Sequence, residues 1–212
     1  NIVLVLMNGR PLNLTWADEN IPAILETWHL GTQSGNAIAE VLYGNYNPSG
    51  KLTMSFPRNV GQVPLYYNYK KTGRPGASSK EVTKSTYADV ENSPLYPFGY
   101  GLSYTSFSYS DLSLSSNEIT RDDTIVVSVK ITNTGKVKGK EVVQMYIRDH
   151  YGSLARPVKE LKGFELVELN PGETKEVSFE IDNSTLIYYT ANDRWESEIG
   201  KFSVFIGGDS DV

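Results

Sequence analysis

The fold of the second half of the chain is decided by residues 124–131, TIVVSVKI, in which apolar and polar side chains alternate. The alternation places Ile125, Val127, Val129 and Ile131 on one face of an extended chain, as in a half-buried β-strand. Residues 175–181 and 202–206 alternate in the same way. Further strands are expected at residues 109–114, 142–148, 159–169 and 186–189, with turns at Asn133-Thr134-Gly135 and Asn170-Pro171-Gly172-Glu173. About seven short strands between residues 107 and 212 predict an all-β sandwich of the immunoglobulin-like type.

The first 60 residues show the pattern of an α/β unit. Residues 2–7, IVLVLM, are continuously apolar, as in a central parallel strand. A second apolar segment, 23–28, leads into a predicted helix with Ala37, Ile38, Val41 and Leu42 on one face, Ser34 as N-cap and Gly44 as the stop. Residues 51–56 are expected to form another short strand. Because 60 residues cannot cover both faces of a parallel sheet, we expect the remnant of a larger α/β domain, and a chain that is a fragment.

Residues 61–106 form a connector that is rich in Tyr, Pro and Gly and has no regular periodicity. So many rings favour a segment that is packed against its neighbours. Its cations Lys70, Lys71, Arg74, Lys80 and Lys84, against Glu81, give a local charge of +4. A solvated tip is the favoured interpretation, and an anion site is the alternative.

Composition excludes several classes of protein. The net charge of −5 argues against nucleic acid as the main partner. The longest apolar run, residues 2–7, is far too short for a membrane span. The absence of cysteine excludes a thiolate nucleophile and the disulfide of a true immunoglobulin domain, so fibronectin type III-like is the better description of the sandwich.

A search for catalytic chemistry assigns no catalytic, substrate-binding or metal residue. No serine lies in a Gly-x-Ser-x-Gly motif, and the turn 31–35 lacks phosphate-loop spacing. The acidic pairs Asp18 with Glu19, Asp122 with Asp123, and Asp209 with Asp211 are interpreted as helix-end and turn residues. His29 is placed at the end of a strand, with a packed role favoured over a rim role, and His150 in a solvated loop. For Trp16, Trp28 and Trp195, core packing is the expectation, with sugar stacking as the alternative.

A set of longer motifs carries a resemblance to a known family. These are residues 5–12 (VLMNGRPL), 31–44, 47–52 (NPSGKL), 56–58, 64–68 (PLYYN), 72–75 (TGRP), 94–104 (PLYPFGYGLSY), 133–135, 139–146 (GKEVVQMY) and 156–164 (RPVKELKGF). In this order, they resemble the C-terminal part of family 3 glycoside hydrolases. The resemblance assigns residues 1–60 to the end of an α/β sandwich domain, 61–106 to the connector and 107–212 to a fibronectin type III-like domain.

The resemblance implies retaining β-glycosidase activity, β-glucosidase above all, on a terminal β-linked sugar of an oligosaccharide or β-glucoside. In the family, the nucleophilic Asp lies on an N-terminal TIM-like barrel and the acid/base Glu on an earlier segment of the sandwich domain. Neither residue can be carried over to a position here, so the isolated chain is expected to be inactive. The implied partners are that barrel and the remaining sandwich domain, and no cofactor is expected, since two carboxylates and water suffice. Tyr67, Asn68 and Arg74 are candidate rim residues, and the expected location is periplasmic or secreted.

Other roles stay open at this point. The sandwich could be a non-catalytic module that binds a glycan or a protein, in which case an exposed aromatic platform is expected on one sheet face. It could also mediate dimerisation. Because a truncated parallel sheet leaves an apolar face uncovered, self-association of the chain is a further expectation.

Overall fold

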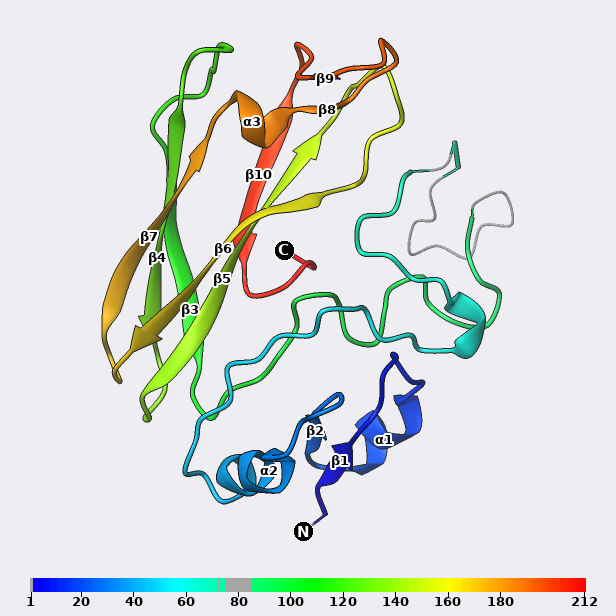
Figure 1. The fold of residues 1–212 in the computed structure, drawn as a ribbon, viewed down its shortest axis with the longest axis vertical. Coiled ribbons are helices and arrows are strands. Elements are labelled where there is room, and N and C mark those ends of the chain that lie inside the picture. The colour runs from blue at the N-terminus through cyan, green and yellow to red at the C-terminus, as the bar shows by residue number, and fades with distance from the viewer. Residues whose placement is uncertain (1, 72, 75–84) are drawn as a thin grey trace.

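The computed structural model describes residues 2–71, 73–74 and 85–212. Figure 1 shows the short elements α1, α2, β1 and β2 gathered at one end of the molecule, next to the N-terminus. The long strands of the sandwich form the other part, and the connector runs between the two. The predicted order, an α/β remnant followed by an all-β sandwich, is confirmed.

The α/β part holds one pair of parallel strands, β1 (Leu4–Leu6) and β2 (Ile24–Glu26). The parallel pairing confirms the expectation from residues 2–7, but the strand is shorter than predicted. Since β2 offers only three partners, Ile2, Val3 and Met7 lie outside the pairing and are exposed. In the sequence, α1 (Thr15–Asn20) lies between the two strands. Leu14, Ala17 and Phe56 form a small core that packs against the strands.

The second helix, α2 (Ser34–Leu42), confirms the predicted helix. The predicted cap is wrong, because Gln33 occupies the N-cap position and makes no side-chain capping bond, while Ser34 is the first helical residue. Gly44 has a φ of +76°, which explains why a glycine ends the helix. No residue of α2 is fully buried, and the apolar face predicted for this helix is only partly covered within the described residues: Ile38 and Val41 are half-buried, while Ala37 and Leu42 are exposed.

The strand predicted at residues 51–56 is wrong. A bend at Thr53 and Met54 interrupts the extended backbone. The segment instead pairs irregularly with the end of the connector: Leu52 N donates to Tyr100 O at 2.8 Å, and Phe56 N donates to Tyr96 O at 2.9 Å. These bonds join the α/β part to the connector.

The connector is ordered by specific contacts, although its only regular element is the 3₁₀ helix η1 (Val60–Gln62) among the described residues. Tyr96 and Tyr100 stack with their ring centroids 5.3 Å apart, and the Tyr96 hydroxyl donates to Asp18 of α1 at 2.6 Å. The basic cluster predicted here lies partly outside the described residues, because Lys80, Glu81 and Lys84 are not among them.

The sandwich consists of two three-stranded antiparallel sheets (Figure 1). One has the order β3 (Phe107–Leu114), β4 (Ile125–Asn133) and β7 (Thr174–Ile181); the other has β10 (Phe202–Gly207), β5 (Gly139–Asp149) and β6 (Glu160–Leu169). Val127, Val129 and Ile131 of β4 are buried against β5, β6 and β7, as the alternation predicts.

The sequence 182–196 departs from the prediction. Asp182 caps a short helix, α3 (Asn183–Leu186), so the strand predicted at 186–189 shrinks to β8 (Tyr188–Tyr189). It pairs with β9 (Trp195–Glu196), which the pattern did not indicate because two residues show no periodicity.

Two of the three tryptophans also differ from expectation. Trp28 packs on Phe56 with a centroid distance of 5.9 Å, as a core residue should. Trp16 and Trp195 are 69% and 67% exposed, so the expected core positions are wrong. Trp16 is a solvent-exposed residue of α1, in which only Ala17 is buried. Trp195 lies in the β8–β9 hairpin, outside the sandwich core.

Candidate functional site

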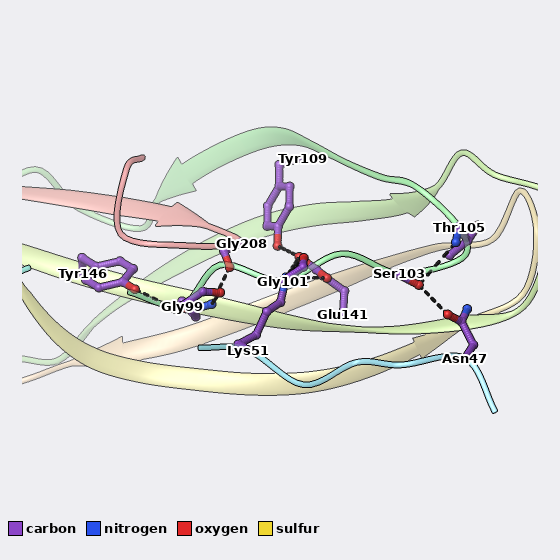
Figure 2. A network of polar contacts seen from close by, with 11 residues as sticks. Asn47, Lys51, Gly99, Gly101, Ser103, Thr105, Tyr109, Glu141, Tyr146 and Gly208 are labelled. Carbon is purple, nitrogen blue, oxygen red and sulfur yellow. Dashed lines mark hydrogen bonds and ion pairs between the residues drawn. The ribbon is translucent and has the colours of Figure 1, made fainter. Parts of the chain in front are cut away.

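A network of polar contacts lies at the interface between the α/β part, the connector and the sandwich. Figure 2 shows side chains from all three converging along β5. Lys51 Nζ lies 3.2 Å from Glu141 Oε2, and the same amine is 3.3 Å from Gly101 O. The Tyr109 hydroxyl donates to Glu141 Oε1 at 2.8 Å. A buried acid is stable when it is paired and hydrogen-bonded in this way.

Burial and the charge of Glu141 both affect the pKa of the neighbouring Tyr109. Burial raises the pKa of Tyr109, and the nearby Glu141 carboxylate raises it further. The phenol therefore stays protonated and keeps donating to Glu141. This contact helps to hold β3 against β5.

A second contact centres on Gln144, which is buried on the outer face of β5. Its amide nitrogen donates to Gly99 O at 3.1 Å and to Gly208 O, and its amide oxygen accepts from the Tyr146 hydroxyl at 2.6 Å. Gly99 has a φ of +81°, and a Cβ there would collide with the Gln144 side chain. Only glycine therefore allows the connector to approach the strand so closely.

Asn47 makes the third contact, at the far end of the interface (Figure 2). Its amide nitrogen donates to Lys138 O at 2.9 Å. Its amide oxygen accepts from Ser103 Oγ at 2.9 Å and from Tyr104 N at 2.8 Å. One side chain thus ties the α/β part both to the connector and to the sandwich.

Aromatic packing closes the interface. Tyr67 and Phe98 of the connector stack with centroids 4.3 Å apart, and the Tyr67 ring meets buried Tyr146 edge-on at 5.9 Å. Leu161 N donates to the Tyr67 hydroxyl at 3.2 Å. Such pairs add stability beyond the area that they bury.

The residues singled out in the sequence lie in different places. Tyr67, a candidate rim residue, is part of this interface, while Asn68 and Arg74 are exposed. The ring of His29 is exposed and lies over the Cα of Gly9. His150 is partly buried, and its Nε2 lies 2.8 Å from Ser203 Oγ, so its interpretation as a merely solvated loop residue is corrected.

The acidic pairs occupy the positions expected of them. Asp18 lies in the first turn of α1. Asp123 Oδ2 accepts from Thr120 N at 2.9 Å, and Asp209 Oδ1 accepts from Asp211 N at 2.8 Å. Both contacts close local turns.

The roles of Asn47, Lys51, Glu141 and Gln144 were not found from the sequence. All four lie inside the motifs 47–52 and 139–146 that carry the family resemblance, which is the one signal that could have pointed to them. Apart from Tyr146, which lies two positions from Gln144, the partners named above are 32 to 91 positions away in the chain, beyond the reach of any local pattern.

The described residues contain no group of three His, Asp or Glu side chains placed to hold a metal ion. Among the helices in the described part of the chain, none has the length and hydropathy of a membrane span. In the part of the chain that the structure describes, two carboxylates are buried, Glu141 and Asp149, and each is paired with a cation: Glu141 with Lys51, and Asp149 with Arg156 at 3.3 Å. This arrangement can hold parts of the protein together.

An α/β unit bound through a tyrosine-rich connector to a fibronectin type III-like sandwich is the class of structure that these contacts define. Residues 1–104 match the glycosyl hydrolase family 3 C-terminal domain, and residues 141–210 match a fibronectin type III-like domain. The chain belongs to glycosyl hydrolase family 3 and corresponds to a C-terminal portion of its members.

Relatives with known names agree with this assignment. The chain is 56% identical to the periplasmic β-glucosidase of Salmonella typhimurium over 99% of its own length and 28% of that protein, and 47% identical to a β-xylosidase of Formosa agariphila with the same coverage. The structure of the β-glucosidase from Listeria innocua in complex with glucose superposes with a TM-score of 0.93 at 43% identity, over 99% of this chain and 29% of that one. The chain thus spans less than a third of the relatives that it matches.

Proposed function

We propose that the chain is the C-terminal structural portion of a retaining β-glycosidase of the β-glucosidase type, which hydrolyses terminal β-linked sugars. Its named relatives support this, since they include β-glucosidases and a β-xylosidase that match it over nearly all of its length. The domain division at residues 60/61 and 106/107 is part of the proposal. In it, residues 1–60 end the α/β sandwich domain and help to cover the substrate cleft.

The observation that supports a structural role is that the buried carboxylates Glu141 and Asp149 are both held in ion pairs. A retaining glycosidase needs two carboxyl groups only about 5 to 5.5 Å apart. Glu141 and Asp149 lie on the same strand, eight residues apart, which separates them by roughly 26 Å at ~3.3 Å per residue. Each is also held by a cation. These two acids therefore cannot serve as the nucleophile and the acid/base pair.

The proposed partners are an N-terminal TIM-like barrel and the rest of the sandwich domain. The exposed apolar side chains of the α/β part support this, because apolar surface in contact with water prefers to be covered. They are Ile2, Val3, Met7, Trp16, Leu30, Leu42, Tyr43, Tyr46, Met54 and Val60. The same surface supports self-association of the chain when it is produced alone, which sedimentation velocity would detect. A strictly monomeric chain at high concentration would contradict this part of the proposal.

The activity test uses a panel of p-nitrophenyl β-glycosides. The full-length gene product should hydrolyse at least one of these substrates, and the substrate that it hydrolyses identifies the sugar. The purified 212-residue chain should hydrolyse none of them. Turnover that follows the isolated chain through repurification would overturn the proposal. A periplasmic or secreted location is supported by the Salmonella relative, and fractionation of the producing cells tests it.

A second candidate function is glycan binding by the sandwich, and one observation favours it. Tyr189 and Trp195 are exposed side by side in the β8–β9 hairpin, with centroids 5.9 Å apart and rings nearly perpendicular. They form a corner at the end of the sandwich, which differs from the platform expected on a sheet face. Affinity electrophoresis of Trp195→Ala against the unchanged chain in soluble β-glucans tests it; equal mobility would remove this candidate.

A further inference from the structure

A cluster of basic groups at the end of β5 and β10 has no role in the interface described above. In the antiparallel register, Arg148 lies opposite Ser203, and the pairing continues because His150 N donates to Lys201 O at 3.0 Å. Alternate residues of neighbouring strands share a face, so these four side chains project from the same face of the sheet. The 2.8 Å contact between His150 Nε2 and Ser203 Oγ agrees with this placement.

A surface hollow of about 370 Å³ opens beside this cluster. Its walls come from Lys71 of the connector, from Arg148, Asp149 and His150, and from the loop 151–158. It therefore lies where the connector meets the sandwich, and it is large enough for a small oxyanion together with part of the molecule that carries it.

Asp149 and Glu160 near the hollow are each paired with a cation, whereas Glu198 accepts hydrogen bonds from Ser153 N in the wall of the hollow and from the Tyr188 hydroxyl. The guanidinium of Arg156 lies 3.3 Å from Asp149 and 2.7 Å from Glu160, and it stacks on the Tyr188 ring at 3.8 Å. In contrast, no ion pair within residues 2–71, 73–74 and 85–212 involves Lys71, Arg148 or Lys201. Lys71 and Arg148, which line the hollow, thus lack a counter-ion among these residues, and so does Lys201, which pairs with His150 beside the hollow.

The neighbouring cations affect the pKa of His150. Partial burial lowers its pKa, Arg148, Lys201 and Lys71 lower it further, and Asp149 acts in the opposite direction. Like charges placed on one face of a sheet are destabilising, and an anion bound among them would relieve the repulsion.

We propose that this hollow is a binding site for an oxyanion, a sulfate, phosphate or carboxylate group, held by Arg148 and Lys71 with His150 as a further donor, while Lys201 adds positive charge beside it. The guanidinium suits such a ligand because its planar fork binds oxyanions through two parallel bonds. The proposal goes beyond the glycosidase assignment and does not depend on it. The group could be carried by an acidic sugar or be a free inorganic ion.

The test uses the only two histidines of the chain, His29 and His150, as NMR probes in the full chain labelled with ¹³C-histidine. The assignment comes from His29→Asn. Titration with sodium sulfate against sodium chloride at matched ionic strength should shift the His150 resonance saturably and raise its pKa, because a bound anion favours the imidazolium. The His29 resonance should not follow. Arms with glucuronate and glucose 6-phosphate then show whether a sugar carrier binds more tightly than the free ion.

Arg148→Gln should weaken sulfate binding about ten-fold, the effect of losing a charge-assisted hydrogen bond of ~1.4 kcal/mol. Lys138→Gln is the matched control, since it removes one positive charge from the opposite end of β5 and should leave binding unchanged. The absence of a saturable shift at His150, parallel shifts at both histidines, or equal weakening by the two variants would each overturn the proposal. Circular dichroism of Arg148→Gln confirms that the variant tested is folded.

Discussion

Lys51 and Glu141, 90 positions apart in the chain, form a largely buried ion pair with side chains only 13% and 8% exposed. The lysine follows the helix α2 of the α/β part, and the glutamate lies on β5 of the sandwich. The pair therefore links the two parts directly, at a point where neither charge could be left alone without a large cost.

Removing one partner of this pair should destabilise the protein strongly. Lys51→Met leaves the Glu141 carboxylate buried without its cation, which should lower the free energy of unfolding by about 3–5 kcal/mol. The double variant Lys51→Met/Glu141→Met should recover most of the loss. Urea denaturation followed by circular dichroism measures both.

The control for this change is Lys138→Met, which breaks an exposed ion pair with Glu168 and should cost no more than about 1 kcal/mol. Equal losses in Lys51→Met and Lys138→Met would show that the Lys51–Glu141 pair contributes no more than a surface contact.

Gly99 should not tolerate a side chain. Its φ of +81° disfavours any other residue, and a Cβ would displace the Gln144 amide from its two carbonyl partners. We expect Gly99→Ala to cost about 1–3 kcal/mol. Gly35→Ala makes the same change in α2, with open space around the new methyl group, and should stabilise by about 0.5–1 kcal/mol. Thermal melting of the two variants should therefore shift in opposite directions, and a shift in the same direction would refute the steric argument.

Tyr67 should contribute through both its ring and its hydroxyl. Tyr67→Phe keeps the stack on Phe98 but leaves Leu161 N without this acceptor, at a cost of about 1 kcal/mol. Tyr67→Ala also removes the ring and should cost about 3 kcal/mol, the low end of the range for truncating a packed aromatic side chain. The adjacent Tyr66 is exposed, and Tyr66→Ala should stay within about 0.5 kcal/mol in the same denaturation assay. If the two alanine variants lose the same stability, the interface role of Tyr67 is wrong.

Glu198 should make the thermal stability of the protein depend on pH. Hydrogen bonds from the Tyr188 hydroxyl and from Ser153 hold the pKa of this carboxyl below its ordinary value of 4.5. A group with a depressed folded-state pKa stabilises above its unfolded pKa, and this contribution is lost as pH falls through the folded value. Glu198→Gln should therefore melt at a lower temperature than the wild type at pH 7, and the gap should close below about pH 4.5. Tyr188→Phe, which removes one donor, should weaken the pH dependence; a gap that is constant from pH 7 to 3 would contradict this explanation.

The sequence predicted those parts of the fold that local patterns encode. Residues 124–131 repeat with a period of two and became β4 with its predicted face buried. Residues 51–56 also alternate, but their partner is an irregular segment some 45 residues away, so a local pattern could not distinguish a strand from a loop held by single hydrogen bonds. Trp195 was misplaced because large apolar side chains usually indicate a core, whereas here a hairpin of two two-residue strands carries the ring beyond it.

The interface could not be derived in the same way. The sequence shows a lysine at 51 and a glutamate at 141, but only the folded chain shows that they meet. The family motifs marked their neighbourhoods without giving their roles.

The contacts at the interface should make the α/β part, the connector and the sandwich unfold as one cooperative unit, and equilibrium unfolding tests this most directly. In Trp195→Phe, the remaining fluorescence of Trp16 and Trp28 reports on the α/β part, while far-ultraviolet circular dichroism reports mainly on the strands of the sandwich. We predict that the two urea transitions of this variant coincide, as cooperative unfolding requires. A fluorescence transition complete before the sandwich begins to unfold would contradict the claim.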